Sequence, residues 1–139
     1  MQTAILFPAC TRKPTTLIEE KRSSGFPSTA FDYADKPLDL NEHLITHPAS
    51  TFFITVIGDS MISSGIHSKD LLIVDRSIRP SNNSIVLAVV NDEFTLKRFR
   101  KQDNKGFLVS DNYSVPPIEI IPGMSMEIWG VITHVIHRL

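Results

Sequence analysis

The chain has 139 residues, of which 42% are hydrophobic and 21% charged, and its formal net charge is −1 at pH 7. A chain of this length is expected to form one domain whose core needs no metal or disulfide, and a near-neutral charge gives no basic field for nucleic acid. The single cysteine, Cys10, is typical of a reducing cytoplasm. No run approaches membrane-spanning length and no charged signal region precedes the first apolar residues, so neither an anchor nor a leader is predicted.

Residues 1–50 differ in composition from the rest of the chain. Five prolines interrupt this segment, and no sustained apolar pattern crosses it. We therefore predict an N-terminal arm, residues 1–50, that is mostly extended and partly flexible. A short helix is expected near its end, over residues 39–45, with Asp39 as the capping residue.

From residue 51 onward, β-branched and alternating apolar runs predict strands. The expected strands are 51–57, 71–75, 84–90, 93–101, 106–110 and 126–137. Turn-forming residues separate them at 81–83 and at Asn91-Asp92, and the second pair is a hairpin link that brings Val89 beside Phe94. Such short spacing favours a mainly β fold, in which residues 51–139 form compact curled sheets or a barrel.

The stretch 56–61 holds a candidate nucleophile. An apolar run ends at Gly58, Ser60 follows two residues later, and a large apolar residue, Met61, comes next. Glycine lets the backbone turn sharply, so a strand followed by this turn can expose the Ser60 hydroxyl, with turn amides facing a developing oxyanion. A Ser after Gly-Asp is also common in ordinary turns, so this stretch alone does not assign a function.

Lys97 lies inside the predicted strand 93–101. Side chains alternate along a strand, so Lys97 shares a face with Thr95 and Phe99, where its amine can be partly desolvated. The commoner alternative for a single lysine is a solvated position. The basic run 97–101 is itself more typical of a solvated strand edge than of a phosphate site.

The histidines and the remaining aspartates give little sign of other chemistry. His43 and His47 are four apart and can share a helix face, but without a third ligand a solvated pair is favoured over a metal site. His134 and His137 are three apart in a strand pattern and are predicted to point to opposite faces. The aspartates interpreted as turn and strand-end residues are Asp59, Asp70 and Asp75. We expect no metal and no cofactor.

Four linked segments occur in one order along the chain: 58–61, 65–66, 70–75 and 94–97. Together they resemble the serine–lysine self-cleaving family of LexA and UmuD, most closely its UmuD branch, the accessory subunit of an error-prone translesion DNA polymerase. The resemblance covers roughly residue 25 to the C-terminus. It implies a peptidase-like domain in which Ser60 is the nucleophile and Lys97 the general base.

The resemblance also implies a substrate, which is the chain's own arm. The matching bond lies between Ser24 and Gly25. The family usually has Cys or Ala before that glycine, and Ser24 is a departure that is still a small residue. The chain between Ser24 and Ser60 is long enough for the arm to reach its own site or a partner's.

The UmuD branch implies partners as well. It implies a homodimer, trimmed to residues 25–139, that joins the catalytic subunit of a translesion polymerase in the SOS response of the bacterial cytoplasm. The implied trigger is the RecA filament on single-stranded DNA. We expect the C-terminal strand, around 128–136, to provide a pairing edge for the dimer.

Two alternatives to this interpretation exist. LexA-type repressors carry a helix-turn-helix domain, and the segment before the expected cut is too short and too rich in proline for one, so sequence-specific DNA binding is not expected. The alternative from another class is a non-catalytic β-barrel interaction module, in which Ser60 and Lys97 are a vestigial pair.

Overall fold

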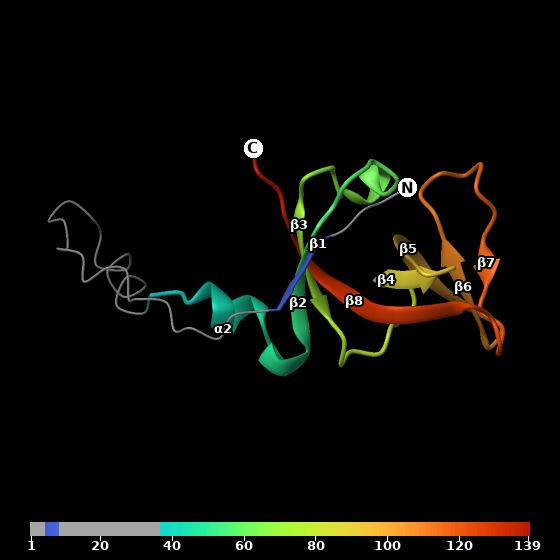
Figure 1. Ribbon diagram of the computed structural model, residues 1–139, viewed down its shortest axis with the longest axis horizontal. Helices are drawn as coiled ribbons and strands as arrows, with labels where there is room; N and C mark the ends of the chain where they lie inside the picture. Colours follow the sequence, from blue (N-terminus) through green and yellow to red (C-terminus); the bar gives the residue numbers. More distant parts are fainter. Residues whose placement is uncertain (1–4, 9–36) are drawn as a thin grey trace, which may run out of the picture.

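The computed structural model describes residues 5–8 and 37–139, which form one antiparallel sheet with little helix (Figure 1). The predicted mainly β fold is thereby confirmed. The elements in chain order are β1 (Ile5–Pro8), α2 (Leu40–Leu44), η1 (Pro48–Ser50), β2 (Thr51–Thr55), η2 (Ile62–Ser64), β3 (Leu71–Asp75), β4 (Ile85–Val90), β5 (Glu93–Gln102), β6 (Lys105–Val109), β7 (Ile118–Glu119) and β8 (Met126–Ile136). The six expected strands are present within a few residues of their predicted bounds. The prediction missed β1 and β7, which are short and lack an alternating pattern.

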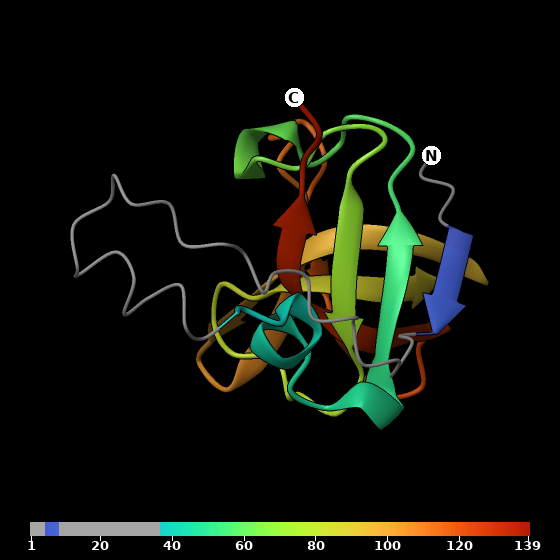
Figure 2. The same cartoon turned by 90° about the vertical axis from the view of Figure 1, so that its left-hand side faces the viewer.

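The strands follow the order β1-β2-β3-β8-β4-β5-β6-β7 across the sheet. The long strand β8 joins two halves, because its first part pairs with β4 and its second part with β3. The sheet curls at this strand, so β4 and β5 run crosswise behind the upright β1, β2 and β3 (Figure 2). No helix within residues 5–8 and 37–139 is long and apolar enough to cross a membrane.

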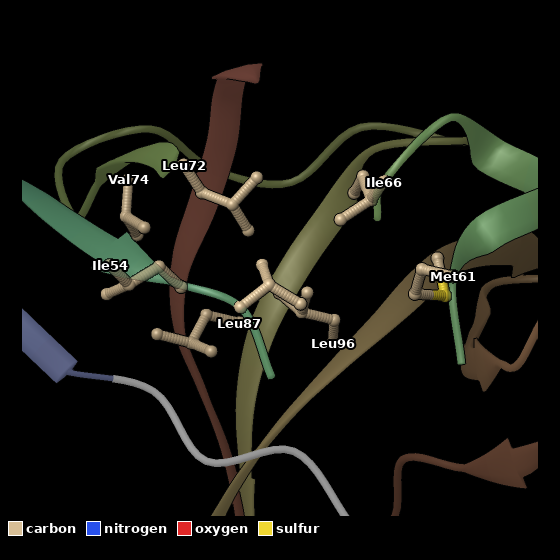
Figure 3. Packing of buried hydrophobic residues seen from close by; sticks show 8 residues of the cluster. Ile54, Met61, Ile66, Leu72, Val74, Leu87 and Leu96 are labelled. Atoms are coloured by element: carbon tan, nitrogen blue, oxygen red, sulfur yellow. The ribbon is translucent and has the colours of Figure 1, made fainter. Parts of the chain in front are cut away.

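The curl encloses the main hydrophobic core. Side chains from both halves of the sheet pack together there (Figure 3). The buried members of this core are Ile54, Val56, Met61, Ile66, Leu72, Val74, Leu87 and Leu96. A second cluster lies on the other face of β4, around Val86, Ala88, Leu108 and Val131. Because neighbouring residues of β4 enter different clusters, the strand is buried on both faces, which explains its unbroken apolar sequence.

Gly130 marks the place where β8 passes over β3. A Cβ atom at this position would lie 2.6 Å from Val74 Cγ1 and 3.3 Å from the Asp75 carbonyl oxygen. No side chain fits in that space, so a glycine is required for the close approach of the two strands. The register of β8 shifts next to this point, between Leu87 and Ala88 of β4.

The hairpin between β4 and β5 agrees with its prediction. Asn91 and Asp92 both have positive φ, 50° and 63°, and Val89 pairs with Phe94 across the hairpin. Two successive residues with positive φ are what a two-residue type I′ turn requires, and Asn and Asp tolerate that conformation. This turn places β5, and with it Lys97, in register beside β4.

The helix α2 is also confirmed, and its end corrects one expectation. Asp39 caps it, accepting a hydrogen bond from the Asn41 amide at 2.9 Å. The helix ends at Leu44, so His43 and His47 do not share a helix face. His47 instead precedes η1 and contacts Asp75. The division of the chain at residue 50 stays a prediction.

Of two predictions about strand edges, one stays a prediction and one is wrong. The strand β8 pairs with β4 over residues 126–131 and with β3 over residues 131–136, so each part is paired on one side, and its role as a pairing edge for a dimer stays a prediction. The strand β5 lies between β4 and β6, so the basic run 97–101 is not at a sheet edge. An apolar or charged pattern reports which side chains are solvated, but it does not report which strands are neighbours.

Candidate active site

The turn after β2 carries Ser60 at an exposed position, and the next residue holds the turn in place. Met61 is 1% exposed and packs in the main core (Figure 3). Gly58 has φ 110°, which allows the backbone to leave β2 sharply. The apolar residue after the serine is therefore an anchor that holds the neighbouring hydroxyl at the surface.

Two amides of this turn are already occupied. Gly58 N donates to Ser68 Oγ at 3.2 Å, and Ile62 N donates to the Asp59 carbonyl at 3.3 Å. These two amides are consequently not available to stabilise an oxyanion. The expectation that the turn amides serve this role therefore does not hold for these two.

Lys97 projects from the middle of β5 and is half-buried. Its neighbour Leu96 points to the opposite face, into the main core, while Thr95 shares the face of Lys97. Lys97 pairs with Val86 of β4, and β6 flanks the strand on its other side. The amine is thus held on a paired strand rather than on a flexible loop.

Ser60 and Lys97 line the same cavity. It has a volume of about 430 Å³, and three segments far apart in the sequence enclose it. The lining residues are Asp59, Ser60, Ile62 and Ser63 after β2; Thr95 and Lys97 on β5; and Ser110, Asp111, Asn112 and Val115 after β6. The apolar contribution comes from Ile62 and Val115. Leu96 does not contribute, because it lies on the core face of β5.

Burial changes the acid–base character of the lysine. Desolvation lowers the pKa of Lys97 below its ordinary value, because the charged ammonium loses contact with water. A lowered pKa raises the fraction of neutral amine at a given pH. A neutral amine has a lone pair and can accept a proton, which the ammonium cannot.

A hydrogen-bonded chain braces the wall of the cavity. Arg98 donates to Ser64 Oγ at 2.6 Å, and Ser64 Oγ in turn donates to Asp111 Oδ1 at 2.9 Å. The other carboxylate oxygen, Asp111 Oδ2, is buried and has no hydrogen-bond partner within the part of the chain that the structure describes. It is therefore an unsatisfied acceptor on a residue that lines the cavity.

These bracing residues were not found from the sequence. Ser64, Arg98 and Asp111 have no motif of their own and meet only because the sheet curls. The expected cleavage residues, Ser24 and Gly25, lie outside the described residues.

Two buried aspartates at the ends of β3 contrast with this cavity. Asp75 accepts hydrogen bonds from Ser50 and Ser77 and contacts His47 Nδ1 at 2.6 Å. Burial on its own raises the pKa of Asp75, but these donors outweigh it and hold the pKa below its ordinary value. Asp70 is held in the same way, with the His67 amide and the His137 imidazole as its partners.

Comparison with known proteins gives a consistent picture. Residues 16–133 match the Peptidase S24-like family. The protein ImpA of Salmonella typhimurium is 42% identical over 123 residues, which cover 88% of this chain and 83% of ImpA. The protein MucA of Escherichia coli is 42% identical over 116 residues, which cover 83% of this chain and 79% of MucA. The LexA repressor of Shewanella piezotolerans is 35% identical over 129 residues, covering 86% of this chain and 63% of the repressor.

Proposed function

The chain belongs to the Peptidase S24-like family, as a UmuD-type member of the LexA and UmuD group, and on this premise we propose that it is a serine endopeptidase that cuts itself. In this proposal Ser60 is the nucleophile, Lys97 is its general base, and the bond cut lies between Ser24 and Gly25. The product, residues 25–139, is the working form of the protein.

The observation that supports this proposal is that Ser60 and Lys97 line one cavity while desolvation lowers the pKa of Lys97. A serine hydroxyl is a weak nucleophile until a base takes its proton. Lysine serves as that base only when it is neutral, which requires a pKa well below the ordinary value of about 10.4. Partial burial on β5 shifts the pKa in the required direction.

The reaction has two steps in the same cavity. Neutral Lys97 takes the proton of Ser60 Oγ as this oxygen bonds to the carbonyl carbon of Ser24. The bond from that carbon to the Gly25 nitrogen then breaks, and the Lys97 ammonium gives the proton to the leaving amine. Water next attacks the ester, with Lys97 again as base, and releases the carboxylate of residue 24.

The cavity also offers a contact for the substrate backbone. Asp111 Oδ2 is buried without a hydrogen-bond partner among the described residues. An extended peptide entering the cavity presents amide groups, and one of these can donate to that oxygen after a side-chain movement that exposes it. Such a contact fixes the position of the scissile bond relative to Ser60, which is where much of the rate of an intramolecular reaction originates.

UmuD-type membership supports the cellular role that we propose. The trimmed chain is a homodimer in the bacterial cytoplasm and acts as the regulatory subunit of an error-prone translesion DNA polymerase in the SOS response. A RecA filament on single-stranded DNA triggers the cut. The second part of β8 pairs with β3 on one side, and no strand of the described residues pairs with its other side, so this edge can contribute to the dimer. Light scattering at micromolar concentration should give the mass of two chains, and a single-chain mass would contradict the dimer.

The direct test is the intact mass of purified protein after long incubation at pH 10, with and without the activating filament. Wild type should yield one new species, residues 25–139, and Ser60→Ala should yield none because no acyl intermediate can form. Equal processing of both proteins would point to a contaminating protease. Processing of neither would favour the non-catalytic interaction module, the candidate to which the unusual Ser24 lends support.

A further inference from the structure

Two histidines and a buried aspartate meet where the end of β8 lies against the turn before β3. Ligand atoms of His67, Asp70 and His137 all lie within 4.8 Å of one another. His137 Nδ1 is 2.5 Å from Asp70 Oδ1, and His67 Nδ1 is 3.7 Å from Asp70 Oδ2. The centroids of the two imidazole rings are 4.8 Å apart, and the ring planes are tilted by 40°. This group is separate from the Ser60 cavity, since none of its members lines that cavity.

One ligand atom of this group lacks a partner. His67 Nδ1 is shielded from solvent and has no hydrogen-bond partner in residues 5–8 and 37–139. Its distance of 3.7 Å from Asp70 Oδ2 is too long for a hydrogen bond. Two ligands bound to one tetrahedral zinc ion at about 2.0 Å lie about 3.3 Å apart. The space between His67 Nδ1 and Asp70 Oδ2 is thus of the size that a cation fills after a small side-chain movement.

We propose that the chain binds one divalent transition-metal ion of the zinc type through His67, Asp70 and His137. Imidazole nitrogens and a carboxylate oxygen are ligands that zinc accepts, and three protein ligands leave a fourth position for water. The Asp70 side chain is 2% exposed, whereas those of His67 and His137 are 43% and 45% exposed. The carboxylate is therefore fixed at the bottom of the site, and the two imidazoles line its entrance.

The surrounding backbone orients the carboxylate. Asp70 Oδ2 accepts a hydrogen bond from the His67 amide at 2.8 Å, and the Asp70 amide donates to the His67 carbonyl at 3.1 Å. These reciprocal bonds fix the turn that carries two of the three ligands. Groups that orient a ligand in this way contribute strongly to metal affinity.

Metal binding at this place would join two parts of the chain. His137 follows β8, and the turn 67–70 is tied to the end of β2: Lys69 N donates to the Val56 carbonyl at 2.7 Å, and Val56 N donates to the Asp70 carbonyl at 3.0 Å. A metal ion would thus cross-link the C-terminal end of the chain to the segment that leads into Ser60. Amide hydrogen exchange at 135–139 and 66–70 should slow when the metal binds.

Calorimetric titration of the metal-free, full-length chain with zinc chloride tests the proposal. Wild type should bind one zinc ion per chain, and His67→Gln and His137→Gln should each weaken the affinity by at least about tenfold. His134→Gln is the matched control, because this exposed histidine contacts only its neighbour Thr133 among the hydrogen bonds of the described residues. It should leave the affinity unchanged.

Cobalt(II) gives a second readout, because its visible spectrum reports nitrogen and oxygen ligation directly in the wild-type chain. Both imidazoles are half exposed, so the glutamine variants are expected to fold, which circular dichroism checks. The absence of saturable zinc binding by wild type would overturn the proposal. So would unchanged binding in a double His67→Gln and His137→Gln variant, which would place the ion at other residues.

Discussion

Buried charge is stabilised at the ends of β3 but disfavoured at the Ser60 cavity. Asp70 and Asp75 are 2% and 3% exposed, yet hydrogen-bond donors surround both carboxylates and hold their pKa values below the ordinary range. Lys97 is less buried than these two aspartates. Desolvation lowers its pKa. For an acid a lowered pKa keeps the charge, whereas for a base it removes the charge.

The difference separates a structural charge from a reactive one. A buried ion surrounded by donors is stable in its charged form, and it holds the chain together. A partly buried amine whose charge is disfavoured is more often neutral at a given pH, so its lone pair is free to accept a proton, which is the property that general-base catalysis needs. One curled sheet supports both, because β3 ends in loops rich in donors while Lys97 faces a cavity.

The largest effect is expected where the reactive charge is removed. Lys97→Ala should slow self-cleavage at pH 7 by about 10²–10⁴-fold, the usual contribution of a general base. Lys97→Arg should fail as well, because the guanidinium group does not lose its proton in proteins. Lys101→Ala is the matched control, since Lys101 is exposed on the same strand and does not line the cavity. Intact mass spectrometry over time measures the rates. A normal rate for Lys97→Ala would contradict the distinction between a reactive lysine and the structural aspartates.

The structural charge should matter for stability. Asp75→Asn leaves the Ser50, Ser77 and His47 groups without their carboxylate, so it should lower the free energy of unfolding by about 1–3 kcal/mol. Urea denaturation measures this change. Asp92→Asn, in the exposed β4–β5 turn, is the control and should have no effect beyond the error of the measurement.

The same carboxylates give the stability a defined pH dependence. Their folded pKa values lie below those of the unfolded chain, about 3.9 for aspartate, so their contribution is complete above that value. It is lost as the pH falls through the lower, folded pKa values. Asp75→Asn should therefore show a weaker loss of stability between neutral and acid pH than wild type, and an identical loss would contradict this account.

A smaller effect is expected at the cavity wall. Asp111→Asn should slow self-cleavage by about tenfold, which corresponds to a hydrogen bond of roughly 1.4 kcal/mol, because one acceptor for the substrate backbone is weakened. The half-maximal pH of the reaction should stay near that of wild type if Asp111 acts by positioning. A changed pH midpoint with an unchanged limiting rate would instead show that Asp111 acts through Lys97. Asp103→Asn, in the exposed β5–β6 turn, is a suitable control.

The sequence predicted most where the structure depends on a local pattern of residues. Alternation and hairpin chemistry located the principal strands, and the linked segments singled out Ser60 and Lys97, which line one cavity. The neighbours of β8 and β5 could not be read in this way, because the side-chain pattern of a strand does not reveal its place in the sheet.

The sequence also did not predict the contacts between residues that are far apart along the chain. Asp111 meets Ser64, and His137 meets Asp70 across 67 positions, only after the sheet has curled around β8. The individual residues looked like ordinary turn and strand-end residues. Their significance comes from burial and from unsatisfied atoms, which are properties of the folded chain.

The pH dependence of self-cleavage tests the central claim most directly, namely that a desolvated Lys97 is the base for Ser60. The first-order rate of wild type, followed by intact mass between pH 6 and pH 11, should rise and then level off. Its half-maximal pH should lie below about 10.4, the ordinary pKa of lysine. Lys97→Ala should lack this titration. A wild-type rate that keeps rising with hydroxide past that pH, or the same profile in Lys97→Ala, would contradict the account.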